Sequence, residues 1–224
     1  MHACRRFLAC LLVVLALGAA GCGGSPAEPL PDAETRILFI GNSLTAWNDL
    51  PGAVASVATA LGFDVATYGI TGNNMALEDH YRSGVGRRIR EMAPDLVVMQ
   101  QGPSSLPQNQ LHLRAWADTL SRIAREVGAE PALLMVWPDL DRLSAFPAVR
   151  DSYLGAAEHV GGIFIPAGEA VRELHMTHPE MTPYSGDRFH PNDTGTVLVA
   201  LVVVGTLFDA PVSGLPATIP AGGG

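Results

Sequence analysis

The sequence predicts a three-layer α/β domain, in which a parallel sheet lies between two layers of helices. Short apolar runs alternate with longer segments of helical periodicity, which is the pattern of parallel strands joined by crossover helices. The chain has 224 residues, of which 48% are apolar, so it is long enough to bury one substantial core. We therefore expect a single folded domain.

Each element follows from a local pattern. The strand candidates are β-rich apolar runs, and between them lie segments of helical length with one apolar face. Pro94 and Pro131 fit exits from helices into strands, because proline cannot continue a helix and restricts the residue before it. In chain order the candidates are strand 36–40, helix 50–61, strand 63–68, helix 76–92, strand 96–100, helix 108–127, strand 132–137, helix 148–159 and strand 162–165.

The C-terminal part contains the most apolar stretch after the N-terminal region, residues 196–208. This stretch is short for a bilayer span, so it is predicted to be a buried terminal helix. Residues 210–224 are rich in Pro and Gly and are predicted to form a poorly ordered tail. The folded domain is therefore expected to cover residues 35–209.

The N-terminus has the plan of an export signal in residues 1–21. Arg5 and Arg6 precede an apolar stretch, and small residues follow it directly before Cys22. This arrangement resembles the bacterial lipobox, with Ala19 where leucine is usual, and it implies that Cys22 is lipidated and anchors the protein to a membrane. Cleavage of an ordinary signal near Ala20 is the alternative. Residues 22–34 would then be a flexible tether, and we expect an exported cell-envelope protein.

Composition narrows the partners and mechanisms. The formal net charge is −8, and without Arg5 and Arg6 the chain has 12 basic and 22 acidic residues, so a nucleic-acid partner is not expected. The chain contains no lysine, which excludes Schiff-base catalysis, a P-loop lysine and a Ser-Lys dyad. No cysteine follows Cys22, so the domain has no disulfide framework.

Two fragments near opposite ends of the domain supply a nucleophile, a base and an acid. Ser43 follows the first predicted strand, where active groups of open parallel sheets gather. Asp187 and His190 lie three residues apart in a turn before the last helix, and Pro191 biases His190 away from helical dihedrals. Histidine activates a serine hydroxyl when a carboxylate orients it. Read singly, Ser43 also fits a turn or helix cap, and the Asp-x-x-His fragment also fits a surface turn.

Four short blocks of the chain resemble those of the SGNH hydrolases, also called GDSL esterases and lipases. Gly41-Asn42-Ser43-Leu44 corresponds to the first block and residues 187–191 to the last. The resemblance implies a flavodoxin-like α/β/α fold with a parallel five-stranded sheet, and a catalytic triad of Ser43, His190 and Asp187. It also nominates the backbone N–H groups of Ser43 and of Gly72, in the second block, as oxyanion donors. A turn role alone is the alternative for Gly72.

The third block departs from the family pattern. The usual Gly-x-Asn-Asp falls on residues 102–105, which contain no asparagine. Some acetyl-esterase branches of the family have Gln-Gly here, so the resemblance nominates the Gln101 amide as the third oxyanion donor. Gln100 and Ser104 remain alternatives, as does a purely structural strand exit.

The remaining polar residues are weaker candidates. The spacing of His175 and His178 does not match a zinc-binding motif, so no metal or cofactor is expected. We expect further polar and aromatic residues at the border of the pocket, in packing or surface positions, or in turns where an acid could replace Asp187 in the triad. These are Trp47, Asn48, Asp49, Asn73 and Asn74 at the border, His80, His112 and His159 in packing or at the surface, and Asp139 and Asp141 in turns. For Trp47, packing in the core is an equal alternative.

The triad predicts a serine hydrolase, and the family resemblance implies that it cleaves carboxylic esters, with O-acetyl groups on carbohydrate as the favoured substrate. This expectation rests on the Gln-Gly variant and on the predicted export. Two alternatives remain open, a non-catalytic glycan-binding protein of the same fold and a transacylase that passes the acyl group to a sugar hydroxyl.

Overall fold

The computed structural model describes residues 32–213. The predicted signal at residues 1–21, the lipidation site Cys22, most of the tether and residues 214–224 lie outside the described residues.

All five strands of the sheet are parallel. They are β1 (Thr35–Gly41), β2 (Val65–Thr71), β3 (Leu96–Met99), β4 (Glu130–Leu134) and β5 (Ile163–Ile165), and they lie side by side in the order β2-β1-β3-β4-β5. This is the flavodoxin-like order, whose reversal point lies between β1 and β3. The predicted fold class is therefore confirmed.

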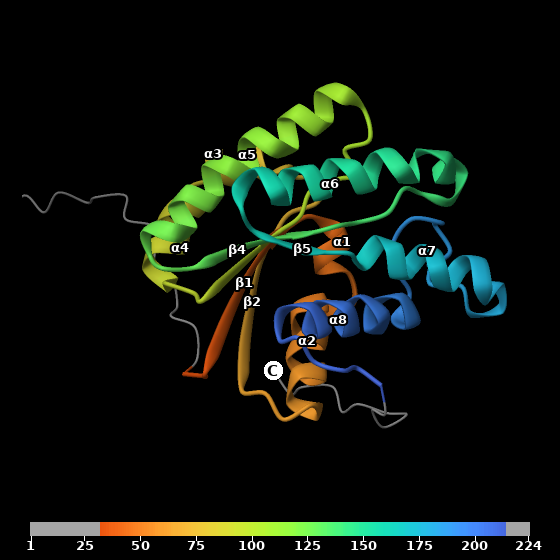
Figure 1. Cartoon of the computed structure of the whole chain (residues 1–224), viewed down its shortest axis with the longest axis horizontal. Coiled ribbons are helices and arrows are strands. Elements are labelled where there is room, and N and C mark those ends of the chain that lie inside the picture. The colour runs from red at the N-terminus through yellow and green to blue at the C-terminus, as the bar shows by residue number, and fades with distance from the viewer. Residues whose placement is uncertain (1–31, 214–224) are drawn as a thin grey trace, which may run out of the picture.

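Helices cover both faces of this sheet (Figure 1). On one side lie α3 (Leu77–Arg82), α4 (Val85–Met92), α5 (Pro107–Glu126) and α6 (Phe146–Val160); on the other lie α2 (Leu50–Ala60), α7 (Ala167–Thr177) and α8 (Asp193–Leu207). Short helical turns, which serve as connections, are α1 (Ser43–Ala46), η1 (Trp47–Asp49), η2 (Leu140–Ala145) and η3 (Pro179–Met181).

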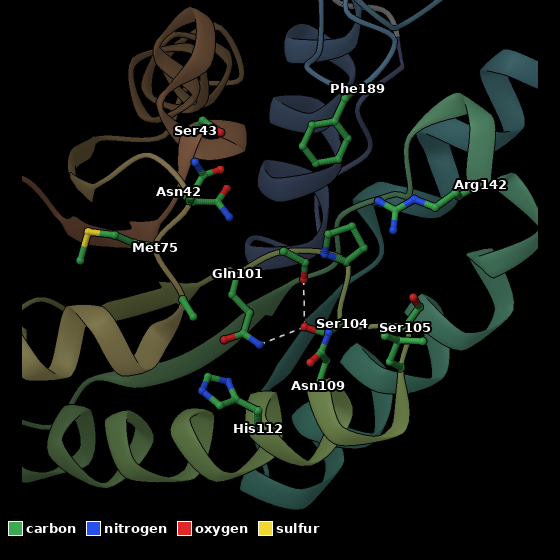
Figure 2. Close-up of a pocket in the computed structure, with 15 residues that line it drawn as sticks. Asn42, Ser43, Met75, Gln101, Ser104, Ser105, Asn109, His112, Arg142 and Phe189 are labelled. Carbon is green, nitrogen blue, oxygen red and sulfur yellow. Dashed lines mark hydrogen bonds between the residues drawn. The ribbon is translucent and has the colours of Figure 1, made fainter.

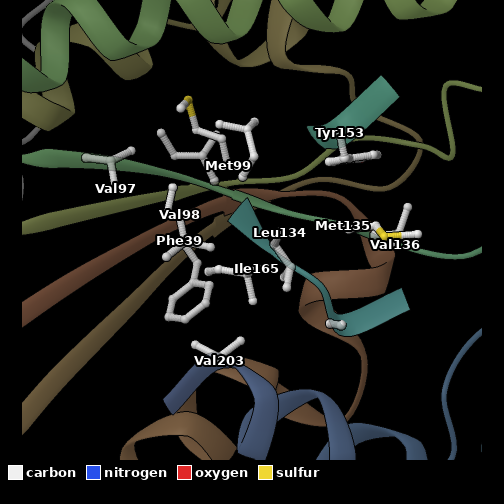
Figure 3. Close-up of a cluster of buried hydrophobic side chains, with 14 of the residues drawn as sticks. Phe39, Val97, Val98, Met99, Leu134, Met135, Val136, Tyr153, Ile165 and Val203 are labelled. Carbon is white, nitrogen blue, oxygen red and sulfur yellow. The ribbon is translucent and has the colours of Figure 1, made fainter. Parts of the chain in front are cut away.

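The core forms because the central strands are covered on both faces, so their residues need not alternate in polarity. All four apolar residues at 37–40 of β1 are fully buried. Phe39 and Ile165 point toward Val203 of α8, whereas Met99 lies on the opposite side of the sheet (Figure 3). Two apolar layers therefore hold β1 and β3 in place, and the loops that follow these strands start from fixed positions.

Several boundaries differ from the sequence prediction. The helix expected at 76–92 is two helices, α3 and α4, because Gly84 adopts a left-handed φ of 88° between them. Helix α7 was not predicted. Strand β2 runs on to Thr71, three residues beyond its predicted end, and this extension affects the site.

The apolar C-terminal stretch forms the helix α8, which packs against α2 and α7 and buries one side. Within residues 32–213, no helix is both long and apolar enough to cross a membrane.

Candidate active site

Three side chains from the two ends of the domain form one hydrogen-bonded chain. Ser43 begins α1 directly after β1, and its Oγ lies 2.8 Å from Nε2 of His190. The other ring nitrogen of His190, Nδ1, lies 2.5 Å from Oδ2 of Asp187. The structure therefore joins the three residues that the sequence nominated, across 147 positions of the chain.

A tight turn fixes Asp187. Its Oδ1 accepts hydrogen bonds from the backbone N–H groups of Phe189 at 3.0 Å and His190 at 2.9 Å, and from the Ser185 hydroxyl at 2.7 Å. The hydrogen bond from the His190 ring is the largest influence on this carboxyl, and together with these donors it holds the pKa of Asp187 well below its usual range. Asp187 is therefore ionised at neutral pH and orients the imidazole.

This pKa shift has a consequence for stability. A carboxyl whose pKa is lowered on folding stabilises the fold at pH values above its unfolded pKa of about 3.9, and that contribution is lost as the pH falls through the folded pKa. We expect the difference in unfolding free energy between wild type and Asp187→Asn to be largest near neutral pH and to shrink below about pH 4. The difference will be small, because the Asp187 side chain is 44% exposed.

Urea denaturation at a series of pH values measures this difference. A difference that stays constant from about pH 7 to about pH 2.5, across the pKa of an unperturbed carboxyl, would contradict the assignment.

Aromatic rings hold His190 in place. The Trp47 ring stacks on the imidazole with centroids 4.3 Å apart and an interplanar angle of 18°, and the Phe189 ring meets it edge-on at 5.2 Å. Trp47 is 42% exposed, so it screens His190 from solvent on one side. The sequence offered Trp47 either a pocket or a packing role, and the structure gives it a stacking role at the histidine.

The loop before Ser43 is clamped to the end of β3. Oε1 of Gln100 accepts from the Asn42 backbone N–H at 2.9 Å and from the Thr45 hydroxyl at 2.8 Å. Nε2 of Gln100 donates to Oδ1 of Asn42 at 3.0 Å and to the Gln101 carbonyl at 2.5 Å. Gln100 is buried and both of its amide hydrogens are used, so it positions the serine loop.

Gln101 differs from the two alternatives, Gln100 and Ser104. Its Oε1 accepts from the Leu77 backbone N–H at 3.2 Å, which fixes the orientation of the amide because that N–H can only donate. Its Nε2 donates one hydrogen to Oγ of Ser104 at 2.9 Å, while the Ser104 hydroxyl donates to the Gly102 carbonyl at 3.0 Å. Counting partners among residues 32–213, only Gln101 of the three candidates keeps an unused amide hydrogen.

The structure differs from the sequence prediction at Gly72. Because β2 extends to Thr71, the Gly72 N–H continues the ladder and donates to the Gly41 carbonyl at 3.2 Å. It is therefore not a free donor here. By contrast, the Ser43 N–H, at the start of α1, has no hydrogen-bond partner within residues 32–213.

A cavity of about 430 Å³ opens beside Ser43, between the loops that follow β1, β2 and β3. Figure 2 shows Gln101 near its centre, His112 entering from α5 and Arg142 on the opposite side. Its wall combines apolar surface with polar groups, which include amides, hydroxyls, an imidazole and a guanidinium. The lining consists of Asn42, Ser43, Asn74, Met75, Ala76, Gln101, Gly102, Pro103, Ser104, Ser105, Leu106, Asn109, His112, Arg142 and Phe189.

Residues outside the cavity brace the loops around it. The Tyr153 hydroxyl, fully buried on α6, donates to the Gln101 carbonyl at 2.5 Å and accepts from the Gln101 N–H at 3.1 Å. The Trp137 indole donates to the Phe189 carbonyl at 2.9 Å, and the Asn48 amide donates to the Pro191 carbonyl at 3.2 Å. The β3 exit and the histidine loop are thus tied to the scaffold.

The alternative acids lie elsewhere. Asp139 pairs with Arg142, whose guanidinium lies 2.5 Å away, and Asp141 pairs with Arg188 at 2.7 Å. Neither hydrogen-bonds His190, so Asp187 is the acid that the structure supports. Asp49 caps α2, and Asn73 is exposed outside the cavity that Asn74 lines.

The other histidines occupy different environments. His80 is buried and donates from Nε2 to the Gly41 carbonyl at 2.8 Å, and burial lowers its pKa. His112 pairs with Glu78 at 2.9 Å and lines the cavity, while His159 is exposed. His175 contacts the Tyr184 ring and His178 pairs with Glu180. Within residues 32–213, no group of three or more His, Cys, Asp or Glu side chains is arranged to hold a metal.

Sequence reasoning missed part of the site. The cavity residues Asn109 and Arg142 and the brace Tyr153 lie in segments without a recognisable block, and Phe189 was not singled out. One local signal was available for Phe189, which lies between Asp187 and His190. The others reach the site only through the packing of helices, which spacing does not reveal.

Comparisons with known proteins place this geometry on a familiar fold. The structure is similar to that of a putative SGNH hydrolase from Slackia heliotrinireducens, with 24% identity, a TM-score of 0.66, and coverage of 77% of this chain and 98% of that one. It is also similar to a DUF4886 family protein from Bacteroides uniformis ATCC 8492, with 16% identity, a TM-score of 0.70, and coverage of 84% of this chain and 88% of that one. A third similar structure is that of a variant of Axe2, an acetyl xylan esterase from Geobacillus stearothermophilus, with 12% identity and a TM-score of 0.64. The match covers 83% of this chain and 98% of that one.

No protein-family model matches the chain. Among curated proteins, the chain is 32% identical over 150 residues to a protein named urease accessory protein UreD 2, from Bradyrhizobium sp. (strain ORS 278). That match covers 64% of this chain and 47% of the other protein, so this chain spans about half of that protein's length. The structural likenesses, all below 25% identity, show that the chain has the fold of SGNH hydrolases.

Proposed function

We propose that this chain, which has the fold of the SGNH hydrolases, is a serine esterase that cleaves short-chain carboxylic esters through an acyl-serine intermediate. The observation that carries the proposal is the hydrogen-bonded chain from Ser43 through His190 to Asp187. A nucleophile, a base and an orienting acid in this order form the catalytic triad that serine hydrolases use for covalent acyl transfer.

The reaction follows from the geometry. Nε2 of His190 takes the proton of the Ser43 hydroxyl as Oγ attacks the ester carbonyl, and the ionised Asp187 stabilises the imidazolium. When the tetrahedral intermediate collapses, the carbon–oxygen bond to the alcohol breaks, and His190 returns the proton to the departing alcohol. Water then attacks the acyl-serine, with His190 again the base, and releases the carboxylic acid and free Ser43.

The oxyanion needs hydrogen-bond donors that are already in place. We assign the Ser43 backbone N–H and Nε2 of Gln101, because each has a hydrogen that no acceptor among the described residues uses, and both residues line the cavity. The contacts to Leu77 and Ser104 fix the Gln101 amide, so no reorganisation is required during the reaction.

Structural neighbours support ester chemistry. One is described as an acetyl xylan esterase, and two further structures of that enzyme are described as catalytic mutants, one at a histidine and one at an aspartate three positions earlier. Asp187 and His190 have the same spacing. We therefore propose that Asp187 and His190 are a catalytic pair in this chain.

The cavity supports a small acyl group on a hydroxyl-rich alcohol. A long acyl chain requires a continuous apolar channel to repay the cost of removing polar walls from water. Here the apolar parts of the wall are interrupted by polar groups, namely the amides of Asn42, Asn74 and Asn109 and the hydroxyls of Ser104 and Ser105. These groups match sugar hydroxyls, so we favour O-acetyl groups on carbohydrate.

A panel of substrates tests the proposed function. We expect hydrolysis of p-nitrophenyl esters with kcat/KM falling from acetate to octanoate, and release of acetate from acetylated xylan. Failure to hydrolyse any ester above the buffer rate would refute the esterase. A preference for octanoate would leave an esterase but refute the short-chain assignment.

Gln101→Glu tests the oxyanion donor. The substitution keeps the size of the side chain and the acceptor for the Leu77 N–H but places a carboxylate where the amide donor stood. Loss of one such donor lowers kcat by about 10²-fold or more, and we expect at least that loss with p-nitrophenyl acetate. Asn109→Asp is the matched control, because it brings the same charge to the same cavity at an exposed position. An equal loss in both variants would show a general charge effect and contradict the assignment.

We also propose that the chain is exported and anchored through a lipid on Cys22. The support is the sequence pattern before this cysteine. Cells expressing the full chain and fed labelled palmitate should yield a labelled wild-type protein and an unlabelled Cys22→Ala variant. Label retained by the variant would refute the anchor.

A further inference from the structure

We propose that an aromatic strip, formed by His112, Trp116 and Tyr81, binds sugar rings of a glycan chain whose ester lies at Ser43. The inference rests on the proposed function, which it deepens: it names a neutral polysaccharide, extending beyond the cavity, as the alcohol portion of the substrate.

The strip is continuous with the cavity. His112 lines the cavity wall and enters it from α5 (Figure 2). The His112 and Trp116 rings lie 6.3 Å apart, and the Trp116 ring lies 5.2 Å from that of Tyr81 on the neighbouring helix α3. On α5, four residues correspond to a rise of about 6 Å, so His112 and Trp116 meet successive parts of an extended chain.

The rings are arranged to receive a ligand. They are tilted, by 51° between His112 and Trp116 and by 43° between Trp116 and Tyr81, so they do not cover one another by flat stacking. Tyr81 is 43% exposed, and Trp116 is half-buried with part of its ring against the core. Within the described part of the chain, neither the Tyr81 hydroxyl nor the Trp116 indole N–H has a hydrogen-bond partner.

The chemistry of these groups fits a sugar ring. One face of a pyranose presents C–H groups whose positive hydrogens meet the negative face of an aromatic ring, while its hydroxyls take up the polar tips of Tyr and Trp. Glu78 lies beside the strip, where its carboxylate bonds His112 at 2.9 Å and Arg82 at 2.6 Å. These paired groups offer planar hydrogen-bonding surfaces to a sugar. Because Glu78 already pairs with Arg82 and His112, they do not offer an unpaired cation that would attract a polyanion. A neutral glycan therefore fits the strip.

Two kinds of substrate test the strip with the folded enzyme. Acetylated xylohexaose, long enough to leave the cavity, is compared with p-nitrophenyl acetate, which is not. The ratio of the two kcat/KM values is used, because any loss of folded protein cancels from it. We expect Trp116→Ala and Tyr81→Ala each to lower this ratio about three- to tenfold, mainly through KM for xylohexaose, as the loss of one aromatic contact predicts.

Tyr68→Ala is the matched control, because Tyr68 is a 37% exposed tyrosine on β2 outside the strip, and its ratio should stay at the wild-type value. In the wild type, acetylated xylohexaose should also be a better substrate than acetylated xylobiose.

Two failures are distinguishable. If the wild type hydrolyses both substrates but the Trp116 and Tyr81 variants keep its ratio, the strip is refuted and the esterase stands. A wild type inactive on p-nitrophenyl acetate and on xylohexaose alike refutes the proposed function, and the strip with it.

Discussion

Replacing Ser43 by alanine is expected to lower kcat for p-nitrophenyl acetate by about 10⁴-fold or more, because the acyl-enzyme cannot form. In the structure Oγ of Ser43 donates toward Nε2 of His190 and lies at the mouth of the cavity, and no other serine has this arrangement among the described residues. The fold should be unaffected, because the Oγ makes no other hydrogen bond there.

Steady-state kinetics and a thermal denaturation curve check this result together. Ser105→Ala is a suitable control, because it removes another hydroxyl from the same cavity wall. A Ser43→Ala variant that keeps the wild-type melting temperature and also most of its activity would contradict the nucleophile assignment.

Replacing His190 by alanine is expected to lower kcat by a similar factor, about 10⁴-fold, because the hydroxyl then has no base. The variant also removes a ring that stacks on Trp47 at 4.3 Å, so it leaves a slot of the size and shape of imidazole. Added imidazole should therefore restore part of the activity of His190→Ala and none of that of Ser43→Ala. Equal stimulation of both variants would show catalysis by imidazole in solution and would contradict the role of His190.

The double variant sharpens these two predictions. Groups that act as a unit give losses that do not add, so Ser43→Ala combined with His190→Ala should be no slower than Ser43→Ala alone. Multiplied losses would mean that the two residues act independently, contrary to their hydrogen bond.

Much of this molecule could be predicted from its sequence, because the information was local. Alternation of strand and helix patterns predicted the parallel sheet, and the residues around Ser43 and His190 form short contiguous blocks. The boundary at Thr71 was harder. Whether a strand continues through a Gly-rich exit depends on its neighbour, and pairing with β1 carried β2 far enough to engage the Gly72 N–H.

The three candidates for the third donor show a different limit. Gln100, Gln101 and Ser104 are chemically similar donors, and the sequence could not separate them by type. The structure separates them by their hydrogen bonds, since the amide hydrogens of Gln100 and the hydroxyl hydrogen of Ser104 are already donated to acceptors in the fold. The brace from Tyr153 was equally hidden, because it depends on where α6 packs against the end of β3.

The most direct test of the esterase is covalent labelling of the native protein with a fluorophosphonate, followed by mass spectrometry of its peptides. The reagent reacts with a serine whose proton is removed by a neighbouring base, and it mimics the tetrahedral intermediate. We predict one labelled residue, Ser43, and loss of labelling in His190→Ala. Absence of label from the folded wild-type protein, or label on a different serine, would contradict the central claim.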